Sequence, residues 1–217
     1  MPRENVMVVA HPHWNDLYIN PNRIPPEWRD ILEYRFPWLM DFVDWYVDQV
    51  IELAVAQGFD VTDVYADAAR RDIIESTIKD VDPLLFFHAD HGGADVLVGQ
   101  DWDRLIDTAN ANILSGRVTY TISCLSAKTL GPDVIAKGGL SYIGYADLAW
   151  VLIIKWKRPE DSEKIRNWDE ASKEGFICGL TRALLVGKTT GETWEELYST
   201  YSELIRYYDT HRDPYKI

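Results

Sequence analysis

Two side chains in this sequence have the chemistry of a nucleophile and its general base, and each follows an apolar run of strand length. His91 comes shortly after residues 84–87, and Cys124 follows residues 118–122. A thiol beside an imidazole can lose its proton to the ring, and the protonated ring can later give that proton to a departing amine. The sequence therefore predicts a catalytic pair of His91 and Cys124.

The residue after the histidine supports this prediction. Gly92 lets the backbone approach a reacting carbonyl closely, so its N–H and that of Cys124 are candidate donors to a developing oxyanion. His88 lies in the same segment and is an alternative base. Only His91 precedes a glycine, which favours it over His88.

The elements that must position these residues alternate between strand and helix. Near-continuous apolar strands separated by helices favour a mostly parallel sheet covered on both faces, which predicts an α/β fold with three layers, α/β/α. Ligands of such sheets bind beyond the carboxyl ends of the strands. The predicted strands are residues 6–10, 60–65, 84–87, 118–122 and 140–143, and the predicted helices are residues 36–57 (ended by Gly58), 70–79, 102–113, 171–186 and a last one opened by a capping box of Thr193 and Glu196.

Composition limits the classes of function. The 217 residues carry a net charge of −13 and two cysteines. An acidic surface repels nucleic-acid phosphates, and two cysteines make no disulfide framework, so we expect no nucleic-acid partner and a reducing, cytoplasmic setting. No signal core and no apolar run of about 18 residues is found, so no membrane partner is expected. We predict one domain over residues 1–217 with a helical C-terminal segment from about residue 160; the oligomeric state is left open.

The order and spacing of three blocks resemble those of clan CD cysteine peptidases, a group that includes caspases, gingipains, clostripain, legumain, separase and CHAT domains. The histidine block is Leu-Leu-Phe-Phe-His-Ala-Asp-His-Gly at residues 84–92, the cysteine block covers residues 113–126, and the next strand with its small-residue turn covers residues 138–145. The resemblance extends from about Val6 to Tyr208.

The resemblance implies a caspase-like sheet and a cysteine endopeptidase that acts through a thioester without metal or cofactor on a peptide or protein substrate. It implies His91 as general base and acid, Cys124 as nucleophile, and the N–H groups of Gly92 and Cys124 as the oxyanion hole. The family needs no third catalytic residue, and none is assigned.

The same resemblance places the substrate pocket beside the loop that follows the fifth strand, which contains Tyr145, Asp147 and Trp150. An acidic side chain there would suit a lysine or arginine before the scissile bond. Asp147 is the candidate for that role, and Asp16 in the first loop is a second one. Trp102 is a further pocket candidate. The arginines with which caspases hold an aspartate are not evident.

Two other functions stay open. His11 and His13, together with His88 and His91, resemble the zinc site of LmbE-like deacetylases, and such a set could hold zinc with a position open for water. However, His13 stands where that family has its catalytic aspartate pair, and Cys124 would have no role. The other alternative is a catalytically silent caspase-like scaffold that binds partners through its acidic surface. We interpret Cys178, on an apolar helix face, as a core residue.

Overall fold

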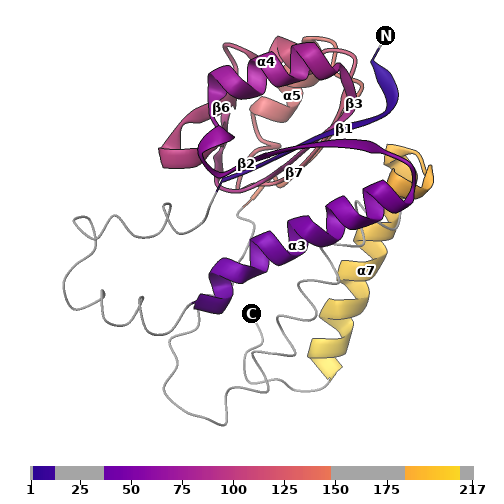
Figure 1. Cartoon of the computed structure of the whole chain (residues 1–217). Coiled ribbons are helices and arrows are strands. Elements are labelled where there is room, and N and C mark those ends of the chain that lie inside the picture. Colours follow the sequence, from indigo (N-terminus) through magenta and orange to yellow (C-terminus); the bar gives the residue numbers. More distant parts are fainter. Residues whose placement is uncertain (1, 13–36, 148–183, 211–217) are drawn as a thin grey trace, which may run out of the picture. The chain divides into compact units, whose positions relative to one another are not determined.

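The computed structural model describes residues 2–12, 37–147 and 184–210 (Figure 1). The chain divides into two compact units, residues 1–150 and 151–217. Whether the two units belong to one domain, as the sequence predicts, is not tested by this division, so the single domain stays a prediction. No helix within the three described ranges is long and apolar enough to cross a membrane.

A five-stranded parallel sheet forms the centre of the first unit, in the order β2-β1-β3-β7-β8. Counted along the chain, this is the doubly wound order 2-1-3-4-5, which grows in both directions from the neighbouring strands β1 and β3. The predicted parallel sheet is therefore confirmed. The bounds are β1 Arg3–His11, β2 Asp60–Tyr65, β3 Pro83–Ala89, β7 Val118–Ile122 and β8 Ser141–Ile143.

Helices cover both faces of this sheet, with α3 (Pro37–Ala56) on one side and α4 (Arg71–Val81) and α5 (Leu130–Ala136) on the other (Figure 1). Successive side chains of a strand point to opposite faces, so adjacent phenylalanines serve different layers. Phe87 meets Tyr46 of α3 edge to face, with ring centroids 6.0 Å apart. Phe86 is buried in the cluster on the α4 side. This arrangement confirms the predicted three layers.

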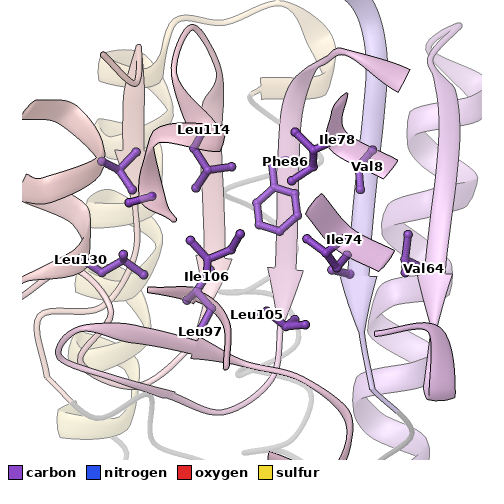
Figure 2. Close-up of a cluster of buried hydrophobic side chains, with 13 residues drawn as sticks. Val8, Val64, Ile74, Ile78, Phe86, Leu97, Leu105, Ile106, Leu114 and Leu130 are labelled. Atoms are coloured by element: carbon purple, nitrogen blue, oxygen red, sulfur yellow. The ribbon is translucent and has the colours of Figure 1, made fainter. Parts of the chain in front are cut away.

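A cluster of buried hydrophobic side chains lies on the α4 side of the sheet, and Figure 2 shows Phe86 within it. Ile74 and Ile78 are four residues apart on α4, which places both on the stripe that faces the sheet. Leu130 of α5 and Val8 of β1 extend the cluster to either side. Burial on this face fixes the positions of the strands, and thus of the loops at their carboxyl ends.

A small antiparallel sheet, in the order β4-β5-β6, is inserted between β3 and β7. It consists of β4 (Gly92–Gly93), β5 (Val96–Val98) and β6 (Arg104–Asp107), with short 3-10 turns η2 (Gln100–Trp102) and η3 (Ala111–Leu114). The helix predicted over residues 102–113 is therefore wrong.

Side-chain hydrogen bonds explain this error, because they offer the backbone an alternative to the helix. The Asn110 side chain accepts the Asp107 N–H at 2.7 Å and donates to the Leu105 carbonyl at 2.9 Å. The Asp107 carboxylate accepts the Ala109 N–H at 2.8 Å. Leu105 and Ile106 are adjacent in β6 and both fully buried. Their side chains point to opposite faces of the strand, so both faces are covered.

The described part of the second unit contains η5 (Leu184–Val186) and α7 (Thr190–Thr210). A final helix was predicted, but its capping box was placed one turn too late. The Thr189 N–H donates to Glu192 at 2.8 Å, and the Glu192 N–H donates back to the Thr189 hydroxyl at 3.3 Å, which is the reciprocal pattern of a capping box. Thr193 lies inside the helix. Of the helix predicted over residues 171–186, residues 171–183 lie outside the described residues.

Candidate active site

Three loops meet at the carboxyl edge of the central sheet, after β3, β7 and β8. The Asp90 N–H donates to the Ile122 carbonyl at 3.3 Å, which joins the first loop to the end of β7. The Leu125 N–H donates to the Asp147 carbonyl at 2.9 Å, and the Ala127 N–H to the Tyr145 carbonyl at 3.0 Å. The segments that the sequence singled out are thus adjacent.

Gly92 lies directly against the loop after β7 that contains Ser123 and Cys124, here called the cysteine loop. A Cβ atom placed on Gly92 would be 2.7 Å from the Cβ of Ser123 and 3.0 Å from the carbonyl oxygen of Cys124. Real Cβ atoms do not approach other atoms so closely, so only glycine fits without a shift of the backbone. The glycine after His91 is therefore a point of close contact between the loops that carry His91 and Cys124.

The register of the small sheet leaves the Gly92 N–H outside its hydrogen-bond ladder. The Val98 N–H donates to the His91 carbonyl at 3.0 Å, and Gly92 is opposite Leu97. Residue pairs in an antiparallel ladder alternate between bonded and non-bonded, so Gly92 and Leu97 form a non-bonded pair. β4 is an edge strand, and the Gly92 N–H points away from β5. This orientation suits a donor to a bound ligand.

His88 is fully buried and bound on both sides of its ring. Its Nε2 lies 2.8 Å from the Val98 carbonyl, which can only accept, so Nε2 carries the proton. Nδ1 then accepts the Ser123 hydroxyl proton at 2.8 Å, and Ser123 in turn accepts that of Thr121 at 2.7 Å. Burial lowers the pKa of His88 from 6.5 to about 4. His88 is thus a neutral structural residue, unsuited to moving protons for Cys124.

His91 has a different environment. It is partly buried, and its ring lies flat on that of Trp102, with centroids 5.0 Å apart and an interplanar angle of 8°. Burial lowers the pKa of His91 from the usual 6.5, so the ring is neutral near pH 7. A neutral imidazole is the form that can accept a proton. Of the two histidines in the block, His91 is therefore the better candidate for a general base.

Cys124 is partly buried at the turn that follows β7. The next residue, Leu125, has φ +61°, a left-handed conformation that is uncommon for a residue other than glycine. The hydrogen bond from the Leu125 N–H to Asp147 holds this turn. Such strained conformations gather at functional sites. Cys178 lies outside the described residues.

Of the predicted pocket residues, Asp147, Tyr145 and Trp102 are described. Asp147 is exposed and Tyr145 partly buried, and their carbonyl groups accept the hydrogen bonds that join their loop to residues 125–127. Trp102 is 53% exposed. Asp16 and Trp150 lie outside the described residues.

His11 is buried at the end of β1, where its Nε2 lies 3.1 Å from Asp63 and its ring lies against that of Tyr65 at 4.6 Å. The His88 ring is hydrogen-bonded through both nitrogens, so one of these bonds would have to break before this ring could hold zinc. The bond of His11 Nε2 to Asp63 does not by itself prevent metal binding through Nδ1. In residues 2–12, 37–147 and 184–210, no three histidine, cysteine or acidic side chains form a group that could hold a metal ion. His13 lies outside these ranges.

Asp90, between the two histidines, is a residue that sequence reasoning did not single out. It is buried, and among the described residues neither carboxylate oxygen has a hydrogen-bond partner of good geometry. Burial raises the pKa of Asp90 well above 3.8, although the His91 N–H and the nearby His11 oppose this rise. Desolvation therefore favours the neutral form of this carboxyl group, which belongs to the residue before the proposed base.

This burial predicts that Asp90 destabilises the fold at neutral and higher pH. Because the folded-state pKa lies above the unfolded value of 3.8, the folded chain binds more protons, and the free energy of unfolding falls as pH rises from about 4 towards the folded-state pKa. The side chain of Asp90→Asn cannot ionise. We therefore expect the free energy of unfolding of this variant to exceed that of the wild type by about 1–3 kcal/mol at pH 8, and by less near pH 4. Urea unfolding at several pH values measures this difference.

The matched control is Asp80→Asn, at an exposed position of α4. It should leave the unfolding free energy within about 0.5 kcal/mol of the wild type at each pH. If the free energies of unfolding of Asp90→Asn and the wild type differ by the same amount from pH 5 to pH 8, the raised pKa of Asp90 is contradicted.

Comparison with known proteins adds little to this description. No model of a protein family matches the chain, and no curated protein matches it. Among solved structures, the response regulator domain of Thermotoga maritima CheB aligns with 13% identity and a TM-score of 0.32, over 77% of this chain and 98% of that one. A likeness this weak supports no inference about function.

Proposed function

We propose that this chain is a cysteine peptidase of the clan CD type, with Cys124 as nucleophile and His91 as general base and acid. The observation that carries the proposal is the contact of Gly92 with Ser123 and Cys124, because it joins the two blocks on which the resemblance rests. The exclusion of His88 and the neutral ring of His91 support the assignment of the base.

In the proposed reaction, the Cys124 sulfur attacks the carbonyl carbon of the scissile bond while His91 takes the thiol proton. The oxyanion so formed accepts hydrogen bonds from the N–H groups of Gly92 and Cys124. Collapse of this intermediate breaks the C–N bond, and the amine leaves with the proton from His91. Water then loses a proton to His91 and attacks the thioester, which releases the acid and returns that proton to the thiol.

The proposed specificity is for lysine or arginine before the cleaved bond. The Asp147 carbonyl accepts the N–H of Leu125, so Asp147 lies on a loop bonded to the residue after the nucleophile, and its side chain is exposed. A carboxylate on this loop would favour a cationic side chain on the substrate. Tyr145 belongs to the same loop and would form part of the pocket wall.

The two alternatives lead to different experimental results. A zinc-dependent amide hydrolase would need His88 to leave one of its present hydrogen bonds. In a catalytically silent scaffold, the contact of Gly92 with the cysteine loop would only stabilise the fold. Neither alternative is favoured by a particular contact among the described residues.

A fluorogenic peptide library tests the three possibilities together. We expect hydrolysis after lysine or arginine, lost when iodoacetamide alkylates Cys124 and unchanged by a chelator; mass spectrometry identifies the alkylated cysteine. Loss with the chelator but not with iodoacetamide would favour the zinc enzyme. No hydrolysis of any peptide would favour the scaffold, and a preference for acidic residues would exclude the proposed role of Asp147.

A further inference from the structure

We infer that Trp102 is a positioning residue, whose indole holds the His91 ring in one orientation for proton transfer to and from Cys124. This inference rests on the proposed function of His91. The two rings are nearly parallel, 8° from coplanar, with centroids 5.0 Å apart. An imidazole stacked in this way cannot turn about its side-chain bonds without losing the contact.

The backbone at Trp102 is unusual for so large a residue. Trp102 has φ +65°, and Asp101 before it has φ +56°. Two successive left-handed residues without glycine are unfavourable, and such strain persists only where surrounding contacts impose it. Trp102 is also 53% exposed, so core burial does not explain its position. In this backbone conformation the Trp102 indole lies on the His91 ring.

The loop that carries Trp102 is fixed at both ends. A Cβ on Gly99 would be 2.2 Å from the Ala69 carbonyl oxygen, so this segment is tightly packed against the start of α4. The Gln100 N–H donates to the same carbonyl at 2.9 Å, and the Asp103 carboxylate accepts the Arg71 N–H at 2.7 Å.

His91 is attached to this same loop. The Val98 N–H donates to the His91 carbonyl at 3.0 Å, one residue before the tightly packed Gly99. An ion pair between Arg70 and Asp101 adds a further tie beside the indole. The histidine backbone and the indole are therefore positioned by one small sheet and its anchored turn, so the orientation of the ring depends on this turn.

The indole also covers one face of the imidazole. Burial is the cause of the lowered pKa of His91, and removal of the indole would expose that face to water. We therefore expect the pKa of His91 to move up towards 6.5 in a variant without the indole. Orientation affects kcat, because proton transfer needs the correct geometry, whereas the affinity for the peptide depends on other contacts.

Trp102→Gly is the most informative variant, because glycine adopts a positive φ without strain. The variant is expected to keep its fold, checked by circular dichroism and cooperative unfolding. Its kcat should fall about tenfold or more while KM stays within about twofold. Trp102→Phe, which keeps a planar ring, should recover most of the lost kcat. The acidic limb of the pH profile should shift to higher pH in Trp102→Gly.

An NMR titration of His91 in the wild type and both variants gives a readout that does not need peptidase activity. A raised pKa of His91 in Trp102→Gly supports the contact even if the chain cleaves no peptide, in which case the proposed function fails and the positioning contact stands. An unchanged His91 pKa together with an unchanged kcat would overturn the inference. A rise in KM with an unchanged kcat would also overturn it, since Trp102 would then be a substrate contact.

Discussion

Replacing Cys124 with alanine is expected to abolish peptide hydrolysis, with kcat lowered about a thousandfold or more. Alanine has no sulfur to form the thioester, so the two-step reaction cannot begin. Loss of the nucleophile in enzymes of this kind typically removes most of the rate enhancement, and what remains comes from binding and from the oxyanion hole. Initial rates on the best peptide of the library measure the effect.

The other cysteine provides the matched control. Cys178→Ala removes a thiol of the same kind and should leave kcat within about twofold of the wild type, since Cys178 belongs to none of the three sequence blocks. Both variants should unfold cooperatively, so that loss of activity is not loss of fold. Hydrolysis that survives in Cys124→Ala would exclude the proposed nucleophile.

Exchanging Gly92 for alanine is expected to lower kcat/KM about a hundredfold, although the residue bears no reacting group. The added Cβ would be 2.7 Å from the Ser123 Cβ and 3.0 Å from the Cys124 carbonyl oxygen, and neither can move as a flexible side-chain end would. The backbone must therefore shift, which separates His91 from Cys124 and displaces the N–H proposed for the oxyanion hole. Steady-state kinetics on the same peptide measure the loss.

The adjacent glycine gives a control of the same size and chemistry. Among the described residues, a Cβ on Gly93 would meet only the Cγ1 of Val96 at 3.2 Å and an Asp95 oxygen at 3.9 Å, both in side chains. Gly93→Ala should therefore keep kcat/KM within about threefold of the wild type. Equal losses in the two variants would show that the hairpin as a whole, not the contact of Gly92, is sensitive.

Much of the fold can be predicted from the sequence, because the central strands and helices follow from local patterns. The strand predicted over residues 60–65 has those bounds in the structure, and Gly58 ends α3 with φ +85°. Continuous apolar strands between helices have few ways to bury their side chains, and a parallel sheet with helices on both faces is the usual one.

Local patterns fail where two solutions fit the same residues. Thr189 with Glu192 and Thr193 with Glu196 both have the spacing of a capping box, and the hydrogen bonds of the structure show that α7 begins with the first pair. Residues 102–113 have a helical pattern, yet the hydrogen bonds of Asn110 and Asp107 favour a strand and turns.

For the candidate site, the residue types that follow the central strands can be identified in the sequence, and their order predicts that the His91, Cys124 and Asp147 segments lie at one edge of the sheet. The contacts between these segments became known only from the folded structure. His88 differs from His91 because Ser123 and Val98 bind its ring. The burial of Asp90 and the stacking of Trp102 on His91 depend on a hairpin without a sequence signal that we recognised. Contacts across strands and through an inserted sheet depend on register and packing, which no local pattern encodes.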